Sequence, residues 1–292
     1  MEFVTLQGRD GAFAMPAVGF GTWKAASGQV DDGIAQEAIR AGYRHFDSAE
    51  YYGTEEAVGR AIRESGVPRE DFTVTSKVWK THMGRQATLD AFERSLSRFG
   101  FDYLDLYFVH WPRYAEGAED WQGVLLDTWG ALEELHDAGR VRALAVSNFK
   151  PRHLELLLEH GHVAPVLNQV EFHPGFLQQE TRTFCKEHGI AVQAWRPLAQ
   201  GSLANNDAMS GIAAAHGVSV GQVALRFDWQ SGVSVVPKST SPERMRQNLD
   251  IFDFELNEDE MEAIRDIPEG TAWSGLDPDG EWPAGLVQLK VD

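Results

Sequence analysis

Short apolar stretches alternate with longer amphipathic segments along almost the whole chain. The short stretches are rich in β-branched and aromatic residues, which is typical of buried strands. Eight strands are expected on this basis: Ala17–Phe20, Tyr43–Asp47, Phe72–Val78, Tyr103–Val109, Val141–Val146, Ala164–Val170, Ile190–Ala194 and Val233–Val236.

The segments between these strands carry apolar residues three and four positions apart, the period of one helix face. Helical patterns run through Val30–Ile39, Ala57–Ile62, Leu89–Phe99, Leu125–Leu135, Leu154–Leu158, the region around Phe184, and Val218–Trp229. Two further helices are predicted from their start signals. Ser241-Pro242-Glu243 combines an N-cap, a first-turn proline and an acid, and Asn257 with Glu260 fits a capping box.

Strand followed by helix, eight times over, predicts an α/β protein in which a parallel sheet closes into a (β/α)8 TIM barrel. No linker or low-complexity stretch interrupts the pattern, so residues 1–292 are expected to form a single domain. The turn Gly8-Arg9-Asp10-Gly11 indicates an N-terminal β-hairpin, expected at the barrel floor. An extra helix and loop follow at the C-terminal end. An open, doubly wound sheet is the alternative.

Composition narrows the classes of partner. The chain has 292 residues, and 44 acidic against 26 basic side chains give a formal charge of −18, which repels nucleic acid. No apolar run approaches the ~18 residues of a membrane helix, and the first residues lack the pattern of a signal peptide. A single cysteine, Cys185, fits a reducing compartment. We expect a cytoplasmic protein with no membrane partner, and nothing suggests an obligate interface, so a monomer is expected.

Seven successive predicted strands end in polar or aromatic residues. They are Asp47, Lys77, His110, Ser147-Asn148, Gln169, Trp195 and Lys238-Ser239. In a barrel these positions meet at one rim, where the active site lies. Each alone has an ordinary explanation, because a strand-end aspartate usually forms a turn and a lysine is usually a solvated charge. Their convergence on one rim favours a catalytic interpretation.

Asp47, Tyr52 and Lys77 suggest acid catalysis. Tyr52 lies in the loop after Asp47, and Lys77 would arrive from the next strand between them. An ammonium beside a phenol favours the phenolate, so we expect the pKa of Tyr52 to fall from ~10. Asp47 would keep the lysine charged, and His110 could donate a hydrogen bond to a substrate oxygen. The alternatives are a satisfied core histidine and a packed aromatic residue.

A proton donor of this kind needs a partner that supplies an electron pair, and a bound nucleotide cofactor could be that partner. Gly19-Phe20-Gly21-Thr22-Trp23-Lys24 lacks the third glycine of a Rossmann fingerprint. Lys238, Ser239 and Arg244 surround a predicted strand-to-helix junction, with Asn248 a turn later, and suit a phosphate dianion. The alternative is a solvated helix start.

These residues belong to motifs that resemble the aldo-keto reductase family over nearly the whole chain. The matching stretches are Gly19-Phe20-Gly21-Thr22-Trp23, Gly42-Tyr43-Arg44-His45-Phe46-Asp47-Ser48-Ala49, Ser76-Lys77-Val78-Trp79, Leu106-Tyr107-Phe108-Val109-His110-Trp111-Pro112, Val146-Ser147-Asn148-Phe149, Asn168-Gln169-Val170-Glu171 and Val236-Pro237-Lys238-Ser239. The tail with Gly275-Leu276-Asp277-Pro278-Asp279 looks most like the bacterial 2,5-diketo-gluconate reductase branch.

The resemblance implies NADPH-dependent reduction of aldehydes or ketones, with α-keto sugars or acids among the candidate substrates. It places the catalytic tetrad on Asp47, Tyr52, Lys77 and His110, with Tyr52 as the general acid. The implied cofactor contacts are Ser147, Asn148 and Gln169 on the carboxamide, Trp195 on the nicotinamide, Lys238, Ser239 and Arg244 on the 2′-phosphate, Gln247 and Asn248 on the adenine, and Thr22, Trp23, Arg196, Leu198 and Thr240 elsewhere. Trp23, Trp79 and Trp111, with His110, would line an apolar substrate pocket whose shape depends on the tail near Trp273 and Trp282.

Two residues depart from the family pattern. Arg196 stands where a small residue is usual, and it could contact the cofactor pyrophosphate, bind an anionic substrate or point outward. Trp195 stands where tyrosine is common and should still stack on a ring.

The sequence leaves two other functions open. The same barrel could be a catalytically idle NADPH sensor or scaffold, and Glu50 with Glu171 could serve a hydrolase as paired carboxylates. The acidic run Asp277-Pro278-Asp279-Gly280-Glu281 lacks the spacing of an EF-hand loop. It is interpreted as a turn, and no metal is expected.

Overall fold

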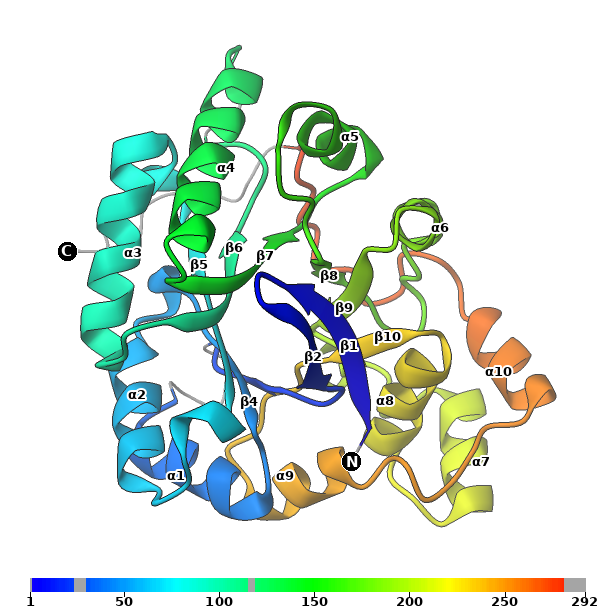
Figure 1. The fold of residues 1–292 in the computed structure, drawn as a ribbon. Helices are drawn as coiled ribbons and strands as arrows, with labels where there is room; N and C mark the ends of the chain where they lie inside the picture. Colours follow the sequence, from blue (N-terminus) through cyan, green and yellow to red (C-terminus); the bar gives the residue numbers. More distant parts are fainter. Residues whose placement is uncertain (1, 24–29, 115–118, 281–292) are drawn as a thin grey trace.

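Eight parallel strands form a closed ring (Figure 1). The structure is a computed structural model that describes residues 2–23, 30–114 and 119–280. The strands are β3 (Phe20–Gly21), β4 (His45–Asp47), β5 (Thr73–Val78), β6 (Leu104–Val109), β7 (Val141–Ser147), β8 (Leu167–Glu171), β9 (Ala191–Trp195) and β10 (Val233–Val235). Each pairs with the next in sequence, and a parallel bridge between Val18 and Val235 closes the ring. The predicted TIM barrel is therefore confirmed, and the open sheet is excluded.

Helices surround the strands. They are α1 (Asp32–Ala41), α2 (Glu55–Glu64), α3 (Arg85–Phe99), α4 (Trp121–Asp137), α5 (Pro151–His160), α6 (Gln179–Glu187), α7 (Asp207–His216), α8 (Val220–Gln230), α9 (Pro242–Leu249) and α10 (Glu258–Arg265), with short 3-10 turns η1 (Glu50–Tyr52), η2 (Arg69–Asp71), η3 (Lys80–His82) and η4 (Ala199–Gly201). Both predicted start signals are confirmed: the Ser241 hydroxyl caps α9, and Asn257 with Glu260 forms a capping box on α10. Helix α7 was not predicted.

A β-hairpin covers one end of the barrel, as expected from the turn sequence. Strands β1 (Phe3–Gly8) and β2 (Gly11–Pro16) pair antiparallel and lie across the ring in Figure 1. Leu6, Phe13 and Met15 of the hairpin pack against residues of β6 and β7. Because the hairpin fills the N-terminal end of the strands, ligands have access from the opposite end, where the strands finish.

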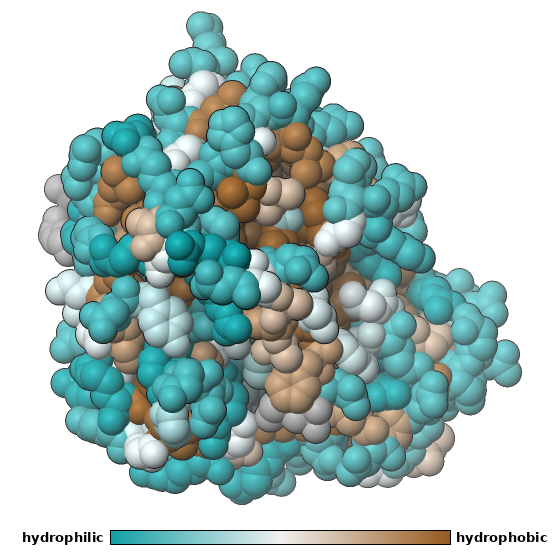
Figure 2. Space-filling model, viewed as in Figure 1, coloured by the Kyte–Doolittle hydropathy of each residue, from teal (hydrophilic) through white to brown (hydrophobic). Residues whose placement is uncertain are grey.

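The surface at the hairpin end is largely hydrophilic (Figure 2). Apolar residues show between the outer helices and beside the hairpin, and hydrophilic residues dominate the periphery. Within the described ranges, no single helix has the length and apolar character to cross a membrane. The pair α7 and α8 meets that test only when joined across a 93° bend.

Candidate functional site

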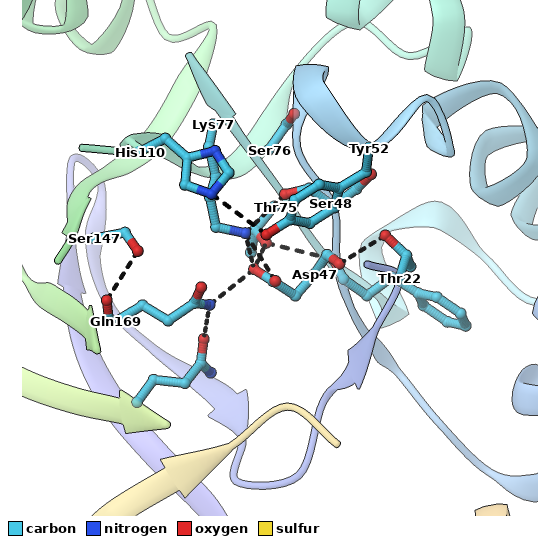
Figure 3. Close-up of polar contacts among 12 residues, drawn as sticks. Thr22, Asp47, Ser48, Tyr52, Thr75, Ser76, Lys77, His110, Ser147 and Gln169 are labelled. Carbon is cyan, nitrogen blue, oxygen red and sulfur yellow. Dashed lines mark hydrogen bonds and ion pairs between the residues drawn. The ribbon is translucent and has the colours of Figure 1, made fainter. Parts of the chain in front are cut away.

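A buried ion pair forms the centre of the site. Lys77 of β5 places Nζ 2.7 Å from each carboxylate oxygen of Asp47, at the end of β4, and donates to the Ser48 carbonyl at 2.9 Å (Figure 3). Burial lowers the pKa of Lys77, and the Asp47 carboxylate opposes this shift. The lysine can therefore remain an ammonium because its partner compensates for lost hydration.

Asp47 has further donors around it. The Thr75 hydroxyl and the Gln169 amide nitrogen each donate to Asp47 Oδ1 at 2.9 Å, and Gln169 also donates to Gln193 at 2.7 Å. The two donors come from β5 and β8, which are not adjacent in the ring, and Gln193 of β9 holds Gln169 in turn, so distant parts of the barrel hold the carboxylate in place. The ion pair has little freedom to rearrange.

Tyr52 and His110 approach each other beside this pair. Tyr52 lies in η1, and its hydroxyl is 3.4 Å from His110 Nε2, a long hydrogen bond. Lys77 Nζ lies 5.1 Å from the centre of the Tyr52 ring. Because the Tyr52 hydroxyl and the His110 imidazole bind each other only weakly, both can contact the oxygen of another molecule, such as a carbonyl compound.

The expectation that Lys77 lowers the pKa of Tyr52 is wrong for this structure. Burial raises the pKa of Tyr52 well above 10, and the nearby Asp47 carboxylate adds to the rise. The positive charge of Lys77 is paired with Asp47, so its attraction for a phenolate is weaker than the cost of the hydration that a buried phenolate loses. Tyr52 therefore keeps its proton at neutral pH. Burial and Lys77 together lower the pKa of His110 well below 6.5, so its imidazole is neutral.

Four predicted cofactor residues form a connected group where β7, β8 and β9 end. The Ser147 hydroxyl donates to the Gln169 carbonyl at 2.8 Å, and the Asn148 amide donates to the His110 carbonyl at 3.0 Å. Trp195 Nε1 donates to Asn148 Oδ1 at 2.8 Å. Asn148 has φ 64°, which is uncommon for a residue other than glycine. These hydrogen bonds hold the four residues in one arrangement.

One cavity of about 830 Å³ runs along the C-terminal ends of the strands. Its lining contains most of the predicted site: Trp23, Asp47, Tyr52, Trp79, His110, Trp111, Ser147, Asn148, Gln169, Trp195, Arg196, Leu198, Lys238, Ser239, Thr240, Arg244, Gln247 and Asn248. Lys77 and Thr22 lie behind this lining. The Thr22 hydroxyl donates to the Asp47 carbonyl at 2.9 Å, so it supports the strand end that carries Asp47.

The far end of the cavity suits an anion. Lys238, Ser239 and Thr240 follow β10, and Arg244 lies in the first turn of α9. Within the part of the chain that the structure describes, the Arg244 guanidinium has no hydrogen-bond or ion-pair partner, although the protein carries 44 acidic residues. A cation without an acid partner beside a helix N-terminus fits a phosphate group of a bound dinucleotide.

Aromatic rings line the cavity next to Tyr52. Tyr51 lies between Trp23 and Trp79, with ring centres 5.1 and 3.9 Å away and nearly parallel planes. Trp79 and Trp111 are buried with Tyr51 in one cluster, and Leu276 packs against it. The three predicted tryptophans therefore meet, whereas Tyr51 and Leu276 were missed as wall residues.

The structure also shows where Arg196 and the carboxylates of Glu50 and Glu171 lie. Arg196 lines the cavity and donates to Glu171 at 3.0 Å. Glu50 is paired with Arg94 and lies, like Glu171, outside the lining as far as the described residues show, so the two carboxylates do not face a common substrate.

The acidic run near the C-terminus binds basic side chains. Asp277 accepts from Lys150 at 2.8 Å, and Asp279 contacts Lys150 at 3.2 Å and His153 at 3.0 Å. Glu281, Trp282 and Lys24 lie outside the described residues. Among the described ones, no group of His, Cys, Asp and Glu could hold a metal.

Comparison with known proteins identifies relatives along most of the chain. Residues 17–269 match the sequence profile of the aldo/keto reductase family. The chain is similar to a glyoxal reductase of Bacillus subtilis, 47% identical over 250 residues (86% of this chain and 88% of the relative). It is also similar to a 9,11-endoperoxide prostaglandin H2 reductase of Trypanosoma cruzi, 44% identical over 274 residues (93% and 94%). The crystal structure of a Gox0644 mutant in complex with NADPH has a TM-score of 0.86 and 35% identity and covers 97% of this chain and 100% of that one.

Proposed function

Since this chain belongs to the aldo/keto reductase family, we propose that it reduces aldehydes or ketones to alcohols with NADPH. Membership places it among oxidoreductases that act on carbonyl compounds in general. The observation that carries the finer proposal is one cavity with a protonated phenol and a neutral imidazole at one end and an unpaired guanidinium at the other. A carbonyl oxygen and a phosphorylated nucleotide each find matching groups there.

The residues along the cavity fit an extended dinucleotide. When bound, NADPH would supply a hydride, which is transferred to the carbonyl carbon. Ser147, Asn148 and Gln169 would hold the carboxamide, and Trp195 would stack on the adjacent ring. Arg244 with Lys238 would bind a phosphate at the other end. Support comes from their positions on one cavity and from the relative crystallised with NADPH.

Tyr52 would donate the proton that the carbonyl oxygen needs. His110 would donate a second hydrogen bond from Nε2 and orient that oxygen. Proton transfer would leave a buried phenolate, which by itself is costly. Lys77 would stabilise it, because its ammonium lies 5.1 Å from the ring centre. Asp47 would keep that ammonium charged and in place.

A catalytically idle NADPH sensor on the same barrel remains the second candidate function. It would keep the anion-binding end and need no proton donor. Asp47, Tyr52, Lys77 and His110 are all present, and they converge in the structure, which favours the enzyme. Tight NADPH binding without oxidation by any carbonyl compound would favour the sensor.

The test is a panel of carbonyl compounds followed by NADPH absorbance, with NADH in parallel. Glyoxal belongs on the panel because of the Bacillus relative, together with aromatic aldehydes, keto sugars and α-keto acids. We expect oxidation of NADPH with at least one class, and slower turnover with NADH at equal concentration. Binding of NADPH with no oxidation across the whole panel would contradict the proposal.

A further inference from the structure

Glu171, the last residue of β8, joins two parts of the cavity lining. Its side chain is 2% exposed, and Oε1 accepts from Arg196 Nη1 at 3.0 Å and from the Ser274 backbone N–H at 2.9 Å. Oε2 accepts from the Ser274 hydroxyl. Arg196 follows β9 and Ser274 belongs to the C-terminal segment, 103 residues after Glu171, so one buried carboxylate joins the end of β9 to the C-terminal tail.

The contact continues to the aromatic wall. The Ser274 hydroxyl, which donates to Glu171, also accepts from the Leu276 backbone N–H at 3.2 Å. Leu276 packs against the cluster of Tyr51, Trp79 and Trp111. A continuous set of contacts therefore runs from the Arg196 guanidinium through Glu171 and Ser274 to Leu276.

Both ends of this set face the same cavity. Arg196, Ser274 and Leu276 line it, and Glu171 lies behind them. Arg196 has φ 58°, a left-handed conformation that is unfavourable for a residue with a Cβ. The ion pair with Glu171 helps to keep Arg196 in that conformation, because a buried carboxylate and a mostly buried guanidinium each need a partner.

We propose that Glu171 is a positioning residue for the proposed carbonyl reduction. It fixes the Arg196 cation beside the cofactor channel and, through Ser274, fixes Leu276 against the substrate wall. The proposal rests on the proposed function, because it takes the Arg196 side of the cavity for NADPH and the Leu276 side for the carbonyl compound. Glu171 itself touches neither ligand.

The contacts of Glu171 form two arms, one to Arg196 and one through Ser274 to Leu276. Three substitutions separate them. Glu171→Gln keeps the size of the side chain and removes the charge from both arms. Ser274→Ala removes only the hydroxyl link to the tail, and Arg196→Met removes only the cation. Since hydrogen bonds to charged groups are the stronger ones, Glu171→Gln should raise both the NADPH Kd and the carbonyl KM by about three- to tenfold.

The single-arm variants should split these effects. Ser274→Ala should raise KM by a similar factor and leave the NADPH Kd within about twofold, whereas Arg196→Met should do the reverse. At saturating NADPH and carbonyl compound, kcat should stay within about twofold of the wild type in all three, because none of these side chains touches the reacting atoms. A loss of kcat with Kd and KM unchanged would contradict a positioning role.

Asp105→Asn is a matched control. Asp105 is a buried carboxylate near the start of β6, at the other end of the barrel, and pairs with Arg69 at 2.9 Å and the Val74 backbone N–H at 2.9 Å. Asp105→Asn should lower the melting temperature without changing Kd or KM. If Glu171→Gln also lowers the melting temperature and leaves both constants unchanged, Glu171 has only a structural role and the proposal is overturned.

Hydrogen exchange tests the proposal without any turnover. In the free protein, the amides of Ser274 and Leu276 should exchange at least about tenfold faster in Glu171→Gln than in the wild type, since both depend on the Glu171 anchor. Asp105→Asn should not change them. If the wild type oxidises no NADPH with any carbonyl compound, the proposed function fails while exchange and the NADPH Kd still test Glu171. Unchanged exchange at both amides would overturn the inference.

Discussion

The ammonium of Lys77 lies 2.7 Å from both carboxylate oxygens of Asp47, and both side chains are almost completely buried. Neither charge is favourable at such a depth without the other. The pair therefore places a positive charge below Tyr52 that persists because neighbouring strands β4 and β5 hold its counter-ion. Under the proposed mechanism, catalysis and stability would both depend on this contact.

Removing one partner should be worse than removing both. Asp47→Asn leaves the buried ammonium without a carboxylate and should destabilise the protein by about 3–5 kcal/mol. Adding Lys77→Met removes the stranded charge and should restore part of that loss, although activity stays low. Urea unfolding of the single and double variants measures the difference. Equal destabilisation in both would contradict the dependence of Lys77 on Asp47.

Arg244 should determine the preference for NADPH over NADH. Loss of a hydrogen bond to a charged group costs about 1.5–3 kcal/mol, so Arg244→Ala should weaken NADPH by about tenfold or more and spare NADH. Arg246→Ala is the matched control, because Arg246 lies in the same helix but outside the cavity lining given by the described residues. Fluorescence titration with both nucleotides measures the effect. Equal losses for the two nucleotides would contradict a 2′-phosphate contact.

His110 should make the protein less stable as the pH falls. Burial and Lys77 lower the pKa of His110 below its unfolded value of ~6.5. Its contribution to stability is therefore complete above pH ~6.5 and is lost as the pH falls from there through the lower folded pKa, by at most ~1.4 kcal/mol per pH unit. His110→Asn should reduce this slope between pH 6.5 and 5. The buried His45, whose pKa is also lowered, is kept in both proteins. Identical slopes in denaturant melts would contradict a neutral buried imidazole.

Gly59 lets helix α2 approach the end of α3. A Cβ at Gly59 would lie 2.1 Å from the Phe99 carbonyl oxygen and 2.6 Å from its Cα, both backbone atoms. Gly59→Ala should therefore cost about 1–3 kcal/mol, despite the gain in helix propensity of ~1 kcal/mol. Gly130→Ala in α4, where nothing lies within 4 Å, should stabilise by up to ~1 kcal/mol. Thermal unfolding compares them, and two stabilised variants would contradict the close packing.

The barrel could be predicted because its strands are buried on both faces. All six residues of β6 are buried, and apart from Asp105 this strand is a short apolar run in the sequence rather than an alternating one. Once the strand ends were known, barrel topology brought Asp47, Lys77 and His110 to one rim. The likeness to the 2,5-diketo-gluconate reductase branch, the cytoplasmic location and the monomer remain predictions.

Other features depend on contacts that no local pattern encodes. Helix α7 was missed although Asn206 caps it and Met209 and Ile212 are buried at helical spacing, because the apolar pattern there is short. Tyr51 joins Trp23 and Trp79 only when three strand ends meet. The pKa of Tyr52 was expected to fall because its partners could be inferred from the sequence, whereas the depth of burial could not.

The most direct test of the account is Tyr52→Phe, which removes one hydroxyl and keeps the ring against Trp23. A general acid contributes about 100-fold to 10,000-fold, so kcat for the best carbonyl substrate should fall within that range. The NADPH Kd should change by less than about twofold, and the melting temperature should show that the variant is folded. An unchanged kcat in a folded Tyr52→Phe protein would show that the proton comes from another group.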